Sequence, residues 1–217
     1  MDPSDTILQP AEPLIPASAS PRRRSILSEA GYQFDVVVPP LEEPEHVTPG
    51  LSPADQAEAL AYFKARAVAD ATTEAVVLGA DTIVAVGQEV LGKPDGQADA
   101  RRMLEALSDT RHAVITGVAL LGPGPRRRIL SDTTYVTMRP LSAEDVQGYI
   151  DSQEWVGKAG AYAIQETADR FVDRIEGSFT NIVGLPIELV RALLAELLTG
   201  PGRQETSPWR ESEPGHC

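Results

Sequence analysis

Apolar positions along this chain follow two patterns: short β-branched runs, and longer segments in which apolar residues recur every three or four positions. The short runs predict strands at 14–17, 34–38, 75–78, 112–121, 129–138 and 171–175. The longer segments predict helices at 22–30, 53–70, 98–107, 142–150 and 186–198. Because strands and helices alternate, the pattern predicts an α/β protein with one or more mixed sheets.

The two ends of the chain lack this patterning. Residues 1–11 are polar and contain proline, and residues 200–217 show no apolar periodicity. We therefore expect a flexible leader at 1–11, one compact domain at 12–199 and a flexible tail at 200–217. A domain of this length has room for two lobes around a cleft.

Composition narrows the classes of partner. The 217 residues are 42% hydrophobic and 24% charged, which supplies enough apolar material for a core. The formal net charge is −13, and an acidic protein repels polyphosphate backbones, so general nucleic-acid binding is not expected. A small anionic ligand can still bind where a few arginines gather.

The single cysteine and the absence of long apolar runs limit the cross-links that the chain can form and the compartment in which we expect it. Cys217 stands alone, which excludes an intrachain disulfide framework and a cysteine metal cluster. No run reaches the ~18 apolar residues of a membrane span, and the first residues lack a signal-peptide pattern. We therefore expect a cytoplasmic protein with no membrane partner.

The segment S-A-S-P-R-R-R at 18–24 joins a predicted strand to a predicted helix. Ser20 suits the N-cap position and Pro21 the first helical position. Arg22 and Arg23 then fall in the first turn, where the positive end of the helix dipole disfavours cations. Free backbone N–H groups there attract anions, and the arginines and serines make this end a receptor for a multiply charged phosphate. The alternative is a solvated basic patch held by acidic neighbours.

The segment G-A-D-T at 79–82 follows the predicted strand at 75–78. A carboxylate at the end of a buried strand, beside glycine and alanine, has a rigid mount and open space. Asp81 could bind a divalent metal or take a proton from water. The alternative is an aspartate that caps a turn.

Four further residues could bind phosphate, a metal ion or a base, but each of them is weak evidence by itself. Lys93 lies in a loop fixed by proline and Lys64 in a predicted helix, and lysine is a compact charge suited to phosphate oxygens. Glu43 offers hard oxygen ligands for Mg²⁺ or Mn²⁺ beside a bound phosphate. Gln165 offers a donor and an acceptor to the edge of a base. Taken singly, each is better explained as an ordinary polar residue, solvated or at the end of a strand.

The sequence contains no motif for several other kinds of catalytic site. The three histidines, His46, His112 and His216, show no metal-ligand spacing. The sequence contains no G-x-S-x-G, H-E-x-x-H or Walker A pattern, so serine hydrolysis and P-loop ATPase chemistry are not indicated.

In their order along the chain, the motifs closely resemble those of the Maf family of nucleoside triphosphate pyrophosphatases. The resemblance covers roughly residues 14–198 and includes S-x-S-P-R-R at 18–23, G-A-D-T at 79–82, L-G-K-P at 91–94, K-A-G-A-Y-x-I-Q at 158–165 and V-G-L-P at 183–186. It implies a mixed-sheet, two-lobed Maf/ITPase-like fold with a central cleft, and a homodimer. It also implies cleavage of a nucleoside triphosphate between its α and β phosphates, with Mg²⁺ or Mn²⁺ as cofactor.

The resemblance extends to a subgroup. Members similar to dTTP/UTP pyrophosphatases carry arginine after S-P, threonine after G-A-D and glutamine after the isoleucine, as Arg22, Thr82 and Gln165 do here. Members acting on 7-methyl-GTP tend to have tryptophan and glutamate at the first and last of these positions. A neutral carboxamide suits uncharged uracil or thymine, whereas a carboxylate suits the cationic methylated guanine.

Three residues of the later segment depart from the family pattern. Gly157 stands where aspartate is frequent, and Ala163 and Glu166 stand where glycine is frequent. Glycine permits positive φ and close backbone approach, so these changes bear on the local loop and on base preference.

Roles for the candidate residues follow from the resemblance. The arginines would hold the triphosphate together with Ser18, and Lys64 and Lys93 would add positive charge. Asp81 would orient and deprotonate the attacking water. The metal ligands would be Glu43 and Asp81, and the residues near base and sugar would be Thr82 and Gln165. The rival readings are a nucleotide-binding regulator of cell division with little turnover, and an enzyme for 7-methyl-GTP or modified pyrimidine triphosphates.

Overall fold

The computed structural model describes residues 8–39, 50–165 and 167–199. The predicted tail at 200–217, most of the predicted leader and Glu43 lie outside the described residues. In the described part of the leader, the Gln9 side chain donates a 3.0 Å hydrogen bond to the carbonyl of Gly31. None of the helices in these three stretches is both long and apolar enough to cross a membrane.

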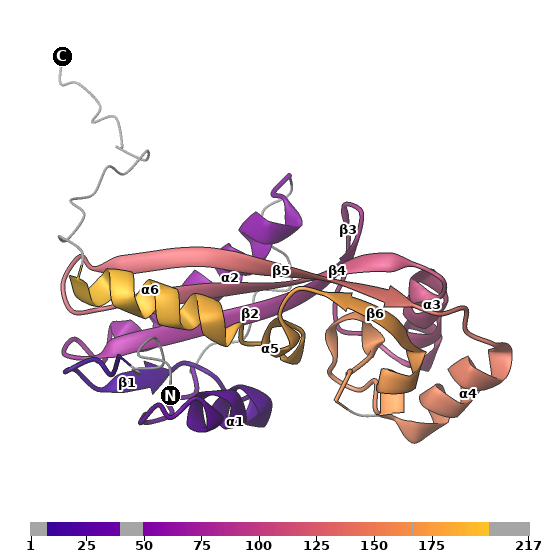
Figure 1. Cartoon of the computed structure of the whole chain (residues 1–217), viewed down its shortest axis with the longest axis horizontal. Coiled ribbons are helices and arrows are strands. Elements are labelled where there is room, and N and C mark those ends of the chain that lie inside the picture. The colour runs from indigo at the N-terminus through magenta and orange to yellow at the C-terminus, as the bar shows by residue number, and fades with distance from the viewer. Residues whose placement is uncertain (1–7, 40–49, 166, 200–217) are drawn as a thin grey trace, which may run out of the picture.

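One mixed sheet runs the length of the molecule (Figure 1). Its path is β1-β2-β4-β5-β6, with β3 paired to β2 off this path. Only the β1–β2 pair is parallel, and the other pairs are antiparallel. The strands are β1 (Leu14–Pro16), β2 (Val76–Val86), β3 (Glu89–Leu91), β4 (Arg111–Leu121), β5 (Arg127–Met138) and β6 (Val172–Glu176).

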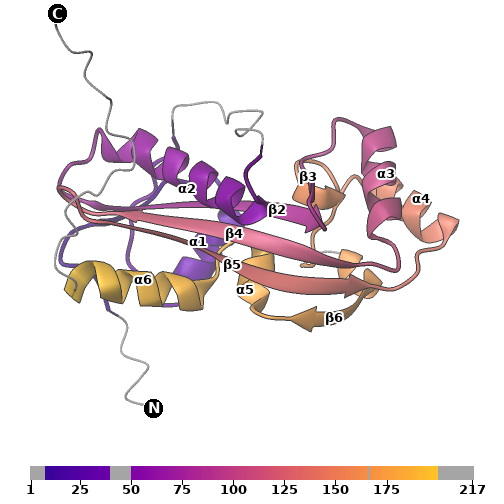
Figure 2. The ribbon, with the colours of Figure 1, turned by 90° about the horizontal axis from the view of Figure 1, so that it is seen from above.

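Helices cover both faces of this sheet. Helix α2 lies along one face, and α5 and α6 lie against the other (Figure 2). The helices are α1 (Pro21–Glu29), α2 (Pro53–Ala69), α3 (Gln97–Leu107), α4 (Ala143–Ser152), α5 (Phe179–Val183) and α6 (Ile187–Thr199), with short 3₁₀ turns η2 (Ala159–Ala161) and η3 (Thr167–Phe171).

Serine caps fix where four helices begin. The hydroxyls of Ser20, Ser52, Ser142 and Ser178 each accept a hydrogen bond from the backbone N–H three residues later. In α4 the Asp145 carboxylate reciprocates by accepting from the Ser142 N–H, which completes a capping box. These caps satisfy N–H groups that have no partner inside the helix.

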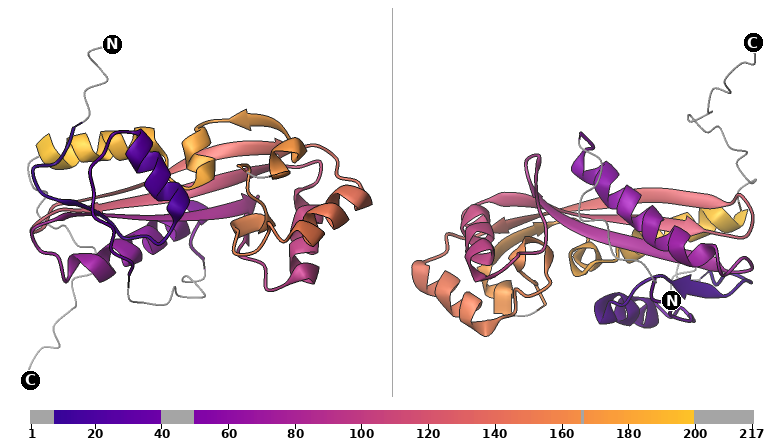
Figure 3. Two further views of the ribbon diagram at one scale, coloured as in Figure 1. Left: turned by 90° about the horizontal axis from the view of Figure 1, so that it is seen from below. Right: turned by 180° about the vertical axis from the view of Figure 1, so that it is seen from behind.

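The molecule has two main cores, one at each end of the sheet. The first packs β1, α1 and α6 against the β2 and β4 residues Val76, Leu78, Val118 and Leu120. The second packs α3, α4 and the segment around Tyr162 against Val84 and Val114 of the same two strands. Figure 3 shows the two groups of helices at opposite ends. The mixed α/β, two-lobed fold expected from the sequence is confirmed.

Most predicted elements are confirmed, but two strand predictions are wrong. The segment 34–38 forms a single parallel bridge, Val37 to Ala17, because Pro16 and Pro39 have no N–H group with which to extend a ladder. The strand predicted at 75–78 continues to Val86, so Asp81 lies in the middle of β2 and not at its end. The sequence pattern also missed α5, which is too short to show periodicity.

Strand β2 is incompletely paired along one edge, and this leaves room for a site. On that edge, β1 pairs with Val76–Leu78 and β3 pairs with Val84–Val86. The residues between, 79–83, pair with β4 on the other edge but with neither β1 nor β3. The side chains of Asp81 and Thr82 therefore stand where the sheet edge is open.

Gly79 lies where α2 closely approaches β2, and it provides a test of this packing. A Cβ at Gly79 would lie 2.1 Å from the backbone oxygen of Ala61. We expect Gly79→Ala to lower the free energy of unfolding by ~3 kcal/mol, because α2 cannot approach β2 without a backbone shift. Urea unfolding followed by circular dichroism measures this.

Gly148 provides the matched control. It lies in α4 with nothing within 4 Å of its added Cβ, so Gly148→Ala should change the free energy of unfolding by at most ~1 kcal/mol, in the stabilising direction. Equal stability of the Gly79→Ala variant and the wild type would contradict the packing described.

Candidate active site

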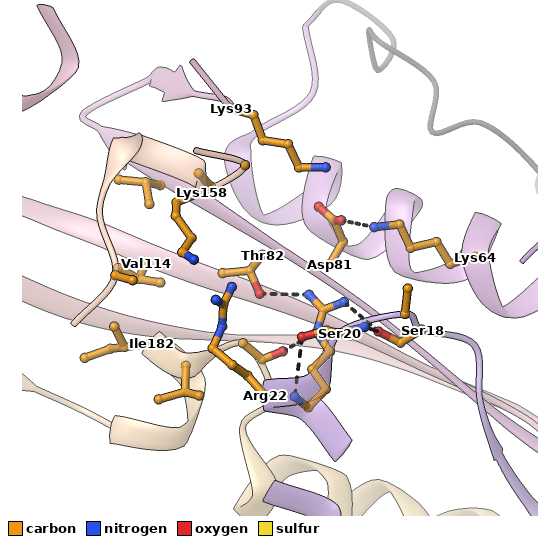
Figure 4. A pocket seen from close by; sticks show the side chains of 18 of the residues that line it. Ser18, Ser20, Arg22, Lys64, Asp81, Thr82, Lys93, Val114, Lys158 and Ile182 are labelled. Atoms are coloured by element: carbon orange, nitrogen blue, oxygen red, sulfur yellow. Dashed lines mark hydrogen bonds and ion pairs between the residues drawn. The ribbon is translucent and has the colours of Figure 1, made fainter. Parts of the chain in front are cut away.

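A pocket of about 350 Å³ lies at the open edge of β2, between the two cores. Residues of the β1–α1 connection, α2, β2, the loop after β3 and the segment 157–165 line it. It gathers every sequence-predicted site residue that the structure describes, namely Ser18, Arg22, Arg23, Lys64, Asp81, Thr82, Lys93 and Gln165. Figure 4 shows the side chains of α1, α2 and β2 converging on this space.

Arg23 is held in the pocket by three side-chain hydrogen bonds. Its Nε donates to the Gly184 carbonyl at 2.8 Å, one Nη to the Thr82 hydroxyl at 3.2 Å and the other to the Ser18 hydroxyl at 3.4 Å. A guanidinium held at all three nitrogens has little rotational freedom left. Its position is therefore set before any ligand binds.

A buried hydrogen-bond network holds Thr82, which in turn binds Arg23. The Thr82 hydroxyl shares a 2.9 Å hydrogen bond with Thr116 on β4, and Thr116 donates to the Asn181 carbonyl of α5. The Asn181 amide donates in turn to the Val114 carbonyl and the Thr134 hydroxyl, both at 3.0 Å. Thr82 thus holds Arg23, and its expected place near base and sugar stays a prediction.

The N-terminus of α1 forms one wall of the pocket, as the sequence predicts. Ser20 caps the helix through the Arg23 N–H, and the Ser18 hydroxyl accepts from the Ser20 N–H at 3.2 Å. Arg22 lies half-buried in the pocket wall, whereas Arg24 is exposed and is not among the lining residues. The helix phase alone separates these neighbouring arginines.

Lys64 and Asp81 form the nearly buried ion pair of the site. The Lys64 ammonium lies 2.5 Å from the Asp81 carboxylate, and each side chain is 11% exposed. Two charges removed this far from water are costly unless they compensate one another. Lys64 contacts one of the two carboxylate oxygens, Oδ1, and therefore orients Asp81 and balances its charge (Figure 4).

Charge in the pocket has the opposite sign to the protein as a whole. Among the described lining residues the cations are Arg22, Arg23, Lys64, Lys93 and Lys158, and the one carboxylate is Asp81. The net charge of the whole chain is −13, so these cations are concentrated against an acidic background. A pocket of this kind attracts a multiply charged anion.

Sequence reasoning missed several of the pocket residues. Lys158 opens the K-A-G-A-Y segment and lines the pocket, but it is not among the residues predicted to form the site. Apolar side chains from distant elements, Val114 on β4 and Ile182 on α5, complete the wall beside Lys158 (Figure 4). For Lys158 the motif itself was the available signal, whereas nothing in the sequence places Val114 or Ile182 at the pocket.

Two buried aromatic side chains, the lining residue Tyr162 and His112, meet at the pocket wall. The Tyr162 hydroxyl and the His112 Nε2 share a 2.8 Å hydrogen bond, and the rings meet edge to face. Burial lowers the pKa of His112 to about 4, because the charged imidazolium is disfavoured away from water. Burial also raises the pKa of Tyr162, so both groups are neutral near pH 7.

The fold and the pocket together define an α/β protein with a preformed, cationic anion pocket between two lobes. Residues 13–197 match the family described as Maf-like protein. The dTTP/UTP pyrophosphatase of Salinibacter ruber is 43% identical over 198 residues, which cover 88% of this chain and 96% of that relative. The dTTP/UTP pyrophosphatase of Vibrio cholerae is 47% identical over 175 residues, covering 80% of this chain and 92% of that relative. This chain belongs to the Maf family.

A solved structure shows the same fold at much lower identity. The Staphylococcus aureus Ham1 protein superposes with a TM-score of 0.51 at 15% identity, covering 85% of this chain and 98% of that one. The likeness concerns the fold alone.

The low pKa of His112 predicts how stability changes with pH. The folded-state pKa of about 4 lies below the value of ~6.5 in an unfolded chain, so the unfolded state binds more protons between these values. The contribution is fully present above pH ~6.5 and is lost as pH falls towards 4. We expect His112 to make the free energy of unfolding ~2 kcal/mol lower at pH 5 than at pH 7.

The measurement is urea unfolding at both pH values for wild type and His112→Gln. The substitution removes the titrating group, so the pH-dependent loss should shrink by the amount assigned to His112. Identical losses in the two proteins would contradict the assignment.

Proposed function

We propose that this protein hydrolyses dTTP and UTP to the nucleoside monophosphate and pyrophosphate. The observation that carries the proposal is the placement of a fixed arginine and the Lys64–Asp81 pair in one cationic pocket. Relatives that are 40–47% identical over most of this chain carry the name dTTP/UTP pyrophosphatase, which supports the same activity here.

The cations of the pocket account for triphosphate binding. Arg23 presents a pre-oriented guanidinium, and Arg22 adds a second from the same helical turn. Lys93 and Lys158 approach from two other segments, so the phosphate chain meets positive charge on several sides. In a pocket partly shielded from water, these groups also stabilise charge that develops on departing pyrophosphate.

Asp81 serves as the general base in this proposal. A water oxygen attacks the α-phosphorus, the proton of that water passes to Asp81, and the α–β bridging oxygen leaves with pyrophosphate. Lys64 holds the carboxylate 2.5 Å away and so fixes the direction in which Asp81 accepts the proton. A general base must lie within reach of the proton that it accepts and must be oriented towards it, and both conditions depend on the Lys64–Asp81 pair.

The donor set fits a divalent cation. Mg²⁺ is usually held by one or two carboxylates together with substrate phosphates, and Asp81 supplies a carboxylate inside the phosphate pocket. Among the described residues no cluster of three or more histidine, cysteine or acidic side chains exists, so the phosphates would complete the coordination. Asp81 would hold the ion and Glu43 is the further proposed ligand. When bound, Mg²⁺ or Mn²⁺ would neutralise phosphate charge.

Base preference is assigned to Gln165. It lines the pocket at the end of the 157–165 segment, and its carboxamide offers a donor and an acceptor to uracil or thymine. A 7-methylated guanine carries positive charge, and the lining offers no carboxylate besides Asp81 among the described residues to receive it. The pocket therefore favours the pyrimidine substrates over 7-methyl-GTP.

The assembly, location and partners of the protein rest on the sequence. A homodimer, a cytoplasmic location and the absence of nucleic-acid and membrane partners stay predictions.

Pyrophosphate release from UTP, dTTP and 7-methyl-GTP, with Mg²⁺ or Mn²⁺ present, tests the activity directly. We expect the two pyrimidine substrates to be used best, and we expect Asp81→Asn to lower kcat by ~10²-fold or more, because the amide cannot accept the proton. Nucleotide binding without turnover by the wild type would favour the regulator instead. Near wild-type kcat in Asp81→Asn would remove Asp81 from the role of base.

Arg23 and Arg24 offer a matched pair for the phosphate site. We expect Arg23→Lys to lower kcat/KM for UTP by ~10–100-fold, since lysine cannot reproduce the three directed hydrogen bonds. Arg24→Lys makes the same chemical change on the exposed side of α1 and should leave kcat/KM within about twofold. Equal effects of the two substitutions would contradict the role of Arg23.

A further inference from the structure

The segment 158–165 contributes six residues to the pocket lining, among them a cation at its start, Lys158, and a carboxamide at its end, Gln165. It contains only the short turn η2, so its own backbone bonds cannot fix its course. Contacts with other elements hold it in three places. The Gly160 N–H donates to the Gly92 carbonyl at 3.0 Å, the Ala163 N–H donates to the Tyr149 hydroxyl at 3.3 Å, and Tyr162 bonds to His112.

The backbone of this segment is strained at the centre. Gly160 and Ala161 both have positive φ, +66° and +60°, and alanine rarely adopts this conformation. Strain of this kind persists only where the surroundings over-determine the backbone. Ala161 is fully buried, and a Cβ at Gly160 would lie 3.0 Å from Val84 of β2, so packing holds the turn in place.

The hydrogen bond between His112 and Tyr162 is a directed side-chain contact between this strained turn and the central sheet, in addition to the apolar packing against Val84. His112 lies near the start of β4, where it pairs with Val136 of β5, and it is 1% exposed. Tyr162 is 6% exposed and lines the pocket three residues before Gln165. A change in this bond would move the segment relative to the sheet that carries Asp81 and Thr82.

We propose that His112 is a positioning residue which acts through the Tyr162 hydroxyl to place Gln165, and so governs discrimination between nucleobases. The inference rests on the proposed function for the identity of the substrate. Arg23 bonds to Ser18 before α1, to Thr82 of β2 and to Gly184 after α5, and the Lys64–Asp81 pair joins α2 to β2, so these contacts involve neither His112 nor Tyr162. Among the cations of the described lining, Lys158 alone lies on the segment 158–165. Base recognition should therefore respond more strongly than phosphate binding when the His112–Tyr162 bond is removed.

The variants separate loss of the bond from loss of the fold. Tyr162→Phe removes only the hydroxyl, and His112→Leu removes the ring nitrogen while keeping an apolar side chain. His112→Gln retains a hydrogen-bonding group and serves as the rescue. Tyr135→Phe removes a hydroxyl from a half-exposed tyrosine of β5 outside the pocket lining and is the matched control. Thermal unfolding verifies that each variant is folded at the assay temperature.

Two calorimetric titrations and one kinetic ratio decide the proposal. We expect Tyr162→Phe and His112→Leu to weaken UMP binding about tenfold and to lower the UTP-to-GTP ratio of kcat/KM about tenfold, while pyrophosphate binding stays within about twofold. The double variant should be no worse than either single variant, because both remove the same bond. His112→Gln should recover most of the UMP affinity, and Tyr135→Phe should behave as wild type.

Two results would overturn the inference. One is UMP affinity and base discrimination unchanged in folded Tyr162→Phe and His112→Leu. The other is a parallel loss of pyrophosphate binding, which would show a general structural role. If the wild type fails to hydrolyse UTP and dTTP, the proposed function fails, and the contrast between UMP and pyrophosphate binding still decides the role of His112.

Discussion

Strand β2 contributes residues to both hydrophobic cores, and the site depends on the part of the strand that lies between them. Its first residues pack with β1, α1 and α6, and Val84 packs with α3 and α4. Because β1 and β3 each cover only one end of its outer edge, the middle of the strand lies open to the pocket. Asp81 and Thr82 occupy this middle and point to opposite faces of the sheet, as alternation along a strand requires.

Each of these two side chains binds a cation that lies on its own face of the sheet. Asp81 pairs with Lys64 of α2, which packs on one face, and Thr82 accepts from Arg23 of α1 on the other. Gly79 lets α2 approach the strand closely enough for the first pair, since any Cβ would meet the backbone of Ala61. The general base and the phosphate clamp of the proposed reaction are thus fixed by one strand and by the packing of two helices on it.

The two ends of the proposed substrate meet walls of different construction. The phosphate end faces helix termini and a strand whose side chains are held by several hydrogen bonds. The base end faces an irregular segment with strained backbone, tied to the sheet through a buried histidine–tyrosine pair. An irregular wall of this kind can vary in shape without disturbing the phosphate site.

Local patterns were enough to predict the elements that begin with clear signals. Ser20 followed by Pro21, Ser52 followed by Pro53, and the Ser142–Asp145 box each mark a helix start by capping chemistry that needs no distant partner. The strand at 34–38 was predicted wrongly because its β-branched residues met proline neighbours that cannot extend a ladder. Helix α5 was missed because five residues are too few for a period.

The chemical identity of the site was determined by the sequence, because serines, arginines, lysines and Asp81 keep their charges and hydrogen-bonding groups wherever the chain takes them. Their arrangement was decided only by tertiary structure. The partners of Arg23 lie up to 161 residues away, on β2 and after α5, and the choice of Lys64 as the partner of Asp81 follows from how α2 packs on β2. Contacts between segments so distant leave no local pattern, which is why the Asn181 network and the His112–Tyr162 bond emerged only from the folded molecule.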